Sequence, residues 1–137
     1  MRWADQLIKL SNFELEELQP RLSQAVTRRE ACELKLLMLT AQGEAELELA
    51  RRDPEAGWRI GPFREALKLR KVTAQRDIEL ARAEEEGARD AIAEAFERLK
   101  KYEQVAESAK AAEVREEARR EAAVLDEMGL RRAAGRR

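Results

Sequence analysis

Two long stretches of the sequence repeat mostly apolar residues at alternating spacings of three and four. In the first stretch the repeated positions are Ile8, Ser11, Leu15, Leu18, Leu22, Ala25, Arg29, Cys32, Leu36, Leu39 and Gly43. In the second they are Leu67, Lys71, Ala74, Ile78, Ala81, Glu85, Ala88, Ile92, Ala95, Leu99, Tyr102, Ala106 and Ala109. A heptad repeat sustained over several turns is typical of a coiled coil. The pattern therefore predicts two long helices, each with one seam that packs against a partner.

A single cluster of helix-breaking residues separates the two stretches. Its members, which fall within ten residues, are Pro54, Gly57, Gly61 and Pro62. A short connection between two such helices favours an antiparallel hairpin. We therefore predict an all-α fold, a long two-helix antiparallel coiled-coil hairpin that forms a single domain over residues 1–137. The expected elements are a helix at about 5–52, a loop at 53–62, a helix at about 63–128 and a basic tail at 129–137.

Pro20 lies inside the first apolar pattern. A proline within a helix removes one backbone hydrogen bond and clashes with the preceding turn. Pro20 is therefore expected either to kink the first helix or to mark the first turn of a new helix after Gln19.

Each seam has one charged residue near its middle, Arg29 in the first helix and Glu85 in the second. A shift of one heptad from the register in which they face each other would place Arg29 against Ile78 or Ile92, leaving a charge on an apolar neighbour. A parallel in-register dimer would oppose like charges. We interpret the pair as a device that fixes register and not as a source of stability. The alternative is that Arg29 lies at the edge of the seam and extends to water.

The same register leaves residues 114–137 without a facing residue on the first helix. An apolar stripe nevertheless continues there, at Val114, Ala118, Leu125 and Met128. An apolar stripe without an internal partner indicates an external partner, or a fold-back onto Trp3, Leu7 and Leu10. The last nine residues carry four arginines and no acidic residue, and are expected to fray.

Composition supports a thin molecule without catalytic chemistry. Lys and Arg number 27, Asp and Glu number 28, and together they make 40% of the chain. No apolar run approaches the roughly 20 residues that span a bilayer, and no signal peptide is recognisable, so we expect a cytoplasmic protein. One cysteine, Cys32, and no histidine argue against a disulfide framework, a cysteine-based metal cluster and a serine–histidine triad. We expect no enzymatic activity, no metal and no cofactor.

The stretch from Arg59 to Arg76, which runs from the predicted loop into the second helix, is strongly basic. Its six basic residues, Arg59, Arg64, Lys68, Arg70, Lys71 and Arg76, accompany a single acidic residue, Glu65. The stretch lacks interleaved aromatic residues and does not lead into a parallel zipper, which argues against nucleic-acid binding. Two interpretations stay open: a solvated helix face, or a docking site for an acidic protein partner.

Large apolar side chains surround the break. They are Trp58, Ile60, Phe63 and Leu67. Aromatic side chains ringed by arginine are typical of interaction hot spots. Because Phe63 and Leu67 lie four residues apart, they share one helix face and could form an outward ridge. The alternative for Trp58 is that it folds over the loop and caps the seam.

Several segments resemble the FliJ family of flagellar export proteins. They are Trp3 to Phe13, Trp58 to Leu67, Ala95 to Glu103 and Leu125 to Met128. The resemblance implies a non-enzymatic component of the type III export apparatus, similar to the stalk of rotary ATPases. It also implies that the chain binds the hexameric export ATPase, contacts the cytoplasmic domain of the export gate and handles export chaperones. The expected location is peripheral, at the inner membrane of the flagellar base.

The resemblance also implies two binding surfaces on this chain. The ATPase-binding residues would be Val114, Leu125, Met128 and Tyr102, and the gate-binding residues Phe63, Leu67, Trp58 and Arg70, of which Arg70 departs from a less basic family pattern. Two other hypotheses remain. One is the related stalk of a virulence secretion system, and the other is a structural coiled coil that homodimerises through the stretch from Val114 to Met128.

Overall fold

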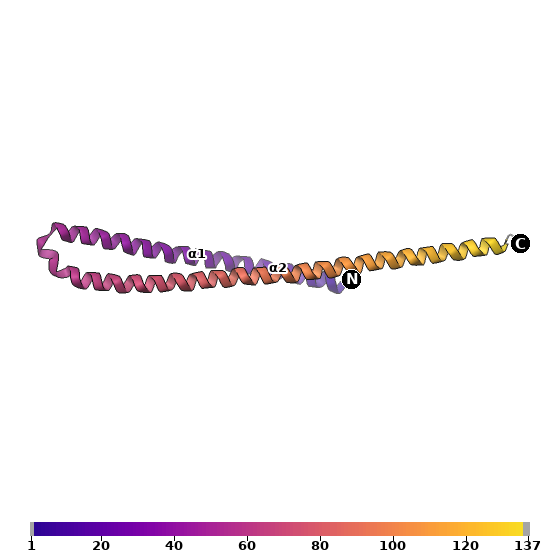
Figure 1. The fold of residues 1–137 in the computed structure, drawn as a ribbon, viewed down its shortest axis with the longest axis horizontal. Coiled ribbons are helices and arrows are strands. Elements are labelled where there is room, and N and C mark those ends of the chain that lie inside the picture. The colour runs from indigo at the N-terminus through magenta and orange to yellow at the C-terminus, as the bar shows by residue number, and fades with distance from the viewer. Residues whose placement is uncertain (1, 136–137) are drawn as a thin grey trace. The chain divides into compact units, whose positions relative to one another are not determined.

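The computed structural model describes residues 2–135, and nearly all of them are helical. Helix α1 spans Arg2–Arg52, a short 3₁₀ turn η1 spans Pro54–Ala56, and helix α2 spans Gly57–Gly135 (Figure 1). No strand occurs in this part of the chain. None of its helices is both long and apolar enough to cross a membrane. The predicted all-α class is confirmed.

The chain reverses direction over a few residues between the helices. α1 ends on two arginines, whose charges suit the negative end of the helix dipole. Asp53 then caps η1, because its Oδ1 accepts a hydrogen bond at 3.1 Å from the backbone N–H of Glu55. Pro54 occupies the first position of η1, where no N–H donor is needed.

This turn is shorter than the loop predicted at 53–62, because α2 already begins at Gly57 and contains Pro62. Gly57 has helical torsions, φ −55° and ψ −34°, and no described glycine has a positive φ. A glycine costs a helix only about 1 kcal/mol relative to alanine. A proline in the second turn removes one hydrogen bond and leaves the following turns intact. The structure therefore assigns residues 57–62 to α2.

The structure excludes one of the two alternatives for Pro20 and shortens the predicted tail. α1 is assigned as one helix through Pro20, so this proline does not begin a new helix. α2 continues to Gly135, through most of the predicted tail, where Arg131 Nη2 donates to Glu127 Oε1 at 3.1 Å. The last two residues of the predicted tail, at 136–137, lie outside the described residues.

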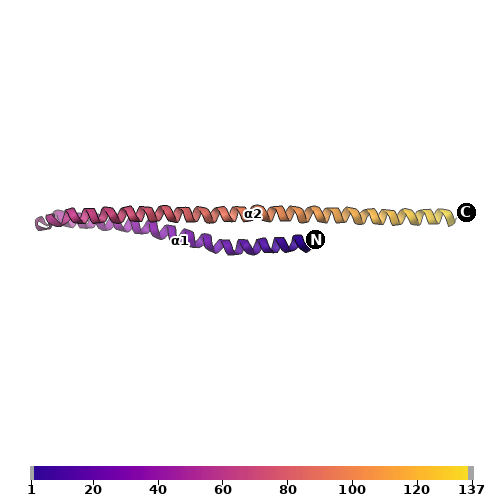
Figure 2. The same cartoon turned by 90° about the horizontal axis from the view of Figure 1, so that it is seen from below.

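The residues from Glu16 to Ala93 form one compact unit around the turn. Arg28 Nη1 donates to Glu84 Oε2 at 2.5 Å, and further along the hairpin Arg82 Nη2 donates to Glu33 Oε1 at 3.4 Å. Residue numbers rise along α1 as they fall along α2, so the helices are antiparallel, as Figure 2 shows. The buried apolar residues of this unit are Ala25, Ala74, Ile78 and Ala81. The predicted helical hairpin is confirmed.

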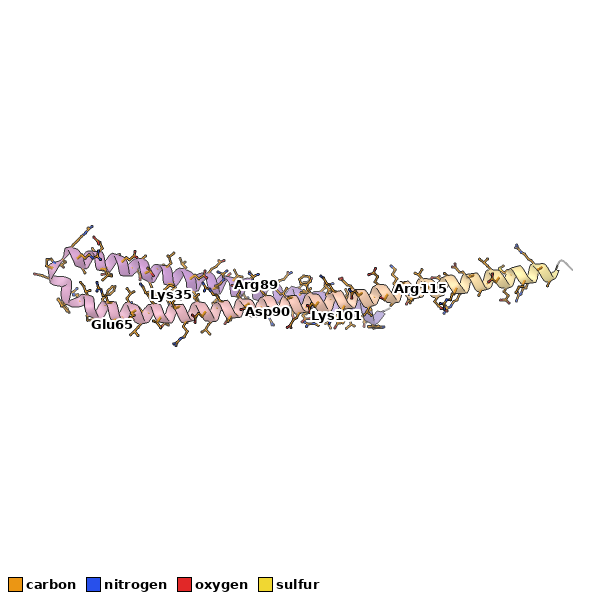
Figure 3. The ribbon with its side chains drawn as sticks, viewed as in Figure 1. Lys35, Glu65, Arg89, Asp90, Lys101 and Arg115 are labelled. Carbon is orange, nitrogen blue, oxygen red and sulfur yellow. The ribbon has the colours of Figure 1, made fainter. Side chains whose placement is uncertain are left out.

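A second unit joins the residues up to Leu15 with those from Glu94 onward. Its buried residues are Ala4, Ser11, Leu15, Ala95 and Leu99. Arg98 Nη2 donates to Glu14 Oε1 at 2.5 Å across the two helices. From residue 110 to residue 135 every described side chain is exposed. Figure 3 shows Arg115 on this stretch of α2, which has no second helix beside it.

Candidate functional site

Arg29 and Glu85 lie opposite each other in the seam of the unit around the turn. Arg29 Nε donates to Glu85 Oε2, and Arg29 Nη1 donates to Glu33 Oε2 at 3.1 Å. Arg89 Nη2 donates to the second oxygen of Glu85, Oε1, at 3.0 Å. Both oxygens of the buried Glu85 carboxylate are therefore engaged. The network joins the two helices through four charged residues.

This network also sets the protonation of its members. The hydrogen bond from Arg29, followed by that from Arg89, lowers the pKa of the Glu85 carboxyl below its usual range. The same hydrogen bond from Arg29 to Glu85 raises the pKa of the Arg29 guanidinium. A carboxylate held ionised with both oxygens occupied is unsuited to general acid–base chemistry. Among the described residues, no group of three or more potential ligands is placed to hold a metal ion.

Two of the predicted gate-binding residues face α1. Leu67 lies against Gly43, where an added Cβ would collide with its Cδ2 atom. Phe63 lines a cavity of about 220 Å³ together with Leu47 and Ala50 of α1. Both side chains are half-buried. The structure therefore corrects the predicted outward ridge: these residues belong to the contact between the helices.

The two remaining predicted gate-binding residues are exposed. Trp58 is 74% exposed, and the Arg59 guanidinium lies 5.0 Å from the centre of its ring. The alternative in which Trp58 covers the seam is therefore not observed. Arg70 is exposed and lines an open groove of about 380 Å³ with Leu69 of α2 and Leu39 of α1.

The outer face of α2 carries an apolar row that the sequence reasoning missed. Leu69 is 68% exposed and Leu80 is 60% exposed, and Val72 between them is also exposed. These residues do not belong to the heptad seam. Their position off the seam was the available signal, since apolar residues that line up on the solvent side of a hairpin mark an interaction surface.

A second groove follows the basic residues of α2. It has a volume of about 550 Å³ and is lined by Arg64, Leu67, Lys68, Lys71, Val72, Gln75, Arg76 and Glu79. None of its four basic side chains takes part in an ion pair within the described residues. By contrast, Arg82 and Arg89 of α2, which lie near Arg29, each form an ion pair. The positive charge of the groove is therefore not neutralised by neighbouring side chains, unlike that near Arg29.

The predicted ATPase-binding residues divide into two groups. Val114, Leu125 and Met128 are exposed on the C-terminal stretch of α2, with Leu125 at 67%. Tyr102 is half-buried. The stretch does not fold back onto the start of α1, since its apolar stripe is uncovered; that alternative is wrong.

Comparison with known proteins identifies the family. No family model and no solved structure matches the chain. Two curated relatives, each named flagellar FliJ protein and found in two strains of Caulobacter vibrioides, are 47% identical to it over 133 residues. The alignment covers 97% of this chain and 96% of each relative. Because this identity extends over nearly the whole length, the chain belongs to the FliJ family of flagellar proteins.

Proposed function

We propose that this protein is a non-enzymatic, stalk-like component of the flagellar type III export apparatus. In this proposal it binds the hexameric export ATPase and links it to the export gate. Its relatives are named as flagellar proteins, which favours the flagellar system over a virulence secretion system. The helical hairpin suits a role in positioning other proteins, because it offers long exposed helix faces.

The observation that carries the proposal is the exposed C-terminal stretch of α2. Residues 110–135 are helical, and every described side chain among them is exposed. Val114, Leu125 and Met128 lie within about 60° of one another around a helix with 100° between successive residues, so they form one stripe. A stripe of this kind is buried when it binds a partner. We assign it to the ATPase; Tyr102 is half-buried and lies outside this stripe.

We place the gate-binding surface on the outer face of α2. Leu69 and Leu80 supply exposed apolar area, while Trp58 and Arg70 supply an aromatic anchor and a charge at the same end of the helix. Tryptophan and arginine are among the residue types enriched at interface hot spots. Phe63 and Leu67 then hold this part of α2 in place from the side that faces α1.

The remaining parts of the proposal follow from the ATPase and gate assignments. The protein associates peripherally with the export apparatus at the inner membrane and works on its cytoplasmic side. It assists export chaperones that deliver their cargo, and it needs no cofactor and no nucleic acid for this role.

The proposal is tested by complementation of a strain that lacks the gene. We expect Leu125→Ala with Met128→Ala to abolish swimming and the secretion of flagellar subunits. The matched control is Leu130→Ala, because Leu130 is similarly exposed but lies on the opposite face of α2. For the gate surface, Leu69→Ala with Leu80→Ala should have the same effect. Normal motility of both double variants, with the proteins folded and present at the wild-type level, would refute the assignment.

A further inference from the structure

Near the turn, a segment of α1 that ends before Arg51 and Arg52 and a segment of α2 carry opposite net charges. From Glu30 to Glu48, α1 has five acidic residues and one lysine, a net charge of −4. From Arg64 to Arg76, α2 has five basic residues and one glutamate, a net charge of +4. Both segments lie within the unit around the turn.

The acidic and basic rows lie on the same flank of the hairpin at the same level. Glu33 and Arg82 are hydrogen-bonded on that flank. Glu44 follows Glu33 by three helical turns, and Lys71 precedes Arg82 by three turns, so each shares a face with its predecessor. No ion pair among the described residues joins residues 35–50 of α1 to residues 60–77 of α2. The two rows therefore stand side by side without neutralising each other.

Apolar area lies along the two charged rows. The groove beside the basic row is lined by the half-buried Leu67 and the exposed Val72. On α1, the exposed Leu37 follows Glu33 by one turn and so lies on the same flank. A surface with an apolar strip and charged edges has the composition of a helix-packing interface.

We propose that this flank binds a second copy of the chain and forms a two-fold symmetric four-helix bundle. A two-fold axis parallel to the helices places α1 of the second copy over α2 of the first, and the reverse, with both turns at the same end. Glu44 of each copy then meets Lys71 of the other. Glu48, which also pairs with Arg51 and Arg52 of its own helix, meets Lys68. Neighbouring helices are antiparallel, as in ordinary four-helix bundles.

The second copy is favoured over other ligands by charge complementarity on both helices. An anionic membrane or an acidic protein would neutralise the basic row of α2 but would leave the acidic row of α1 without a counterpart. A two-fold axis perpendicular to the helices would place α1 against α1 and oppose acidic residues with acidic residues. The two-fold axis parallel to the helices places each acidic row against a basic row of the other copy.

Sedimentation velocity of the full chain tests this interface. We expect a dimer at about 50 mM salt that weakens as salt rises to about 500 mM, because exposed ion pairs are screened. Glu44→Lys with Glu48→Lys should weaken the dimer at least about tenfold, and so should Lys68→Glu with Lys71→Glu. An equimolar mixture of the two double variants should restore a dimer, since each interface then pairs opposite charges again.

Matched controls reverse charges on the opposite flank. Glu46→Lys and Arg70→Glu change exposed residues and should leave the dimer intact. Circular dichroism melts establish that each variant is folded, and the single variants Glu44→Lys and Lys71→Glu replace any double variant that is not. A monomeric wild-type protein at low salt, or double variants that remain monomeric when mixed, would overturn the proposal. Binding to the export ATPase is measured separately, so its failure would not be confused with failure of the dimer.

Discussion

Arg29 of α1 donates a hydrogen bond from Nε to Oε2 of Glu85 on α2, across the seam between the two helices. The seam on either side of this pair is built from small or aliphatic residues such as Ala25, Ala81 and Ile78. Such residues interdigitate in several alignments at similar cost, whereas a charged pair tolerates only one. We therefore propose that the pair sets the register of the hairpin.

We expect Arg29→Leu to leave the melting temperature unchanged or to raise it. Glu85 keeps its hydrogen bond from Arg89, and an apolar residue suits the seam. The register role predicts a broader distribution of distances between spin labels on exposed sites of α1 and α2 near the turn, measured by pulsed electron paramagnetic resonance. A large fall in melting temperature with an unchanged distance distribution would contradict this role.

Glu85 should make the free energy of unfolding depend on pH. Its pKa is lowered in the folded protein, chiefly by Arg29, so its contribution is present above the unfolded pKa of about 4.3 and is lost as pH falls through the lower folded value. We expect Glu85→Gln to flatten the pH dependence of urea unfolding below about pH 4.3. Glu84→Gln, an exposed carboxylate with a single partner, is the matched control. An equal flattening in both variants would show that Glu85 has no special role.

The two glycines inside the seam helices should respond differently to alanine. Gly87 has no atom close to an added Cβ, so Gly87→Ala should stabilise α2 by about 0.5 to 1 kcal/mol. At Gly43 the added Cβ meets the flexible end of Leu67, which must move, so Gly43→Ala should yield less than that gain. Urea unfolding measures both. If Leu67→Ala restores the full gain at Gly43, the contact is the cause; additivity of the two changes would exclude it.

Alanine variants of two leucines that lie two residues apart should distinguish a packed side chain from an exposed one. Leu67→Ala removes a half-buried side chain that faces α1, and we expect it to cost about 1 to 2 kcal/mol of unfolding free energy. Leu69→Ala removes an outward side chain and should change stability by less than about 0.5 kcal/mol. Chemical denaturation followed by circular dichroism distinguishes them. Equal losses would mean that Leu69 is also packed.

The hairpin was predictable because helix periodicity is local and strong. Seam positions repeat in both helices, and the charged residues Arg29 and Glu85 can meet in only one of the alignments considered. The turn was less predictable, because Gly57, Gly61 and Pro62 mark a break in sequence although a helix tolerates them at a modest cost.

The proposed binding surfaces could not be predicted from the sequence, because they depend on tertiary contacts that no local pattern encodes. Leu67 opens the heptad seam and also shares a face with Phe63, so periodicity supported both an inward and an outward orientation. Its contact with Gly43 of α1 selects the inward one. The exposed row from Leu69 to Leu80 becomes visible only once the buried face of α2 is known.

Calorimetric titration of the full chain into the purified flagellar export ATPase tests the proposed function most directly. We expect wild-type protein to bind and to stimulate ATP turnover. Leu125→Ala with Met128→Ala should weaken binding at least about tenfold, while Leu130→Ala should bind as wild type. No binding and no stimulation by the wild-type chain would contradict the proposal, as would an equal loss in all the variants.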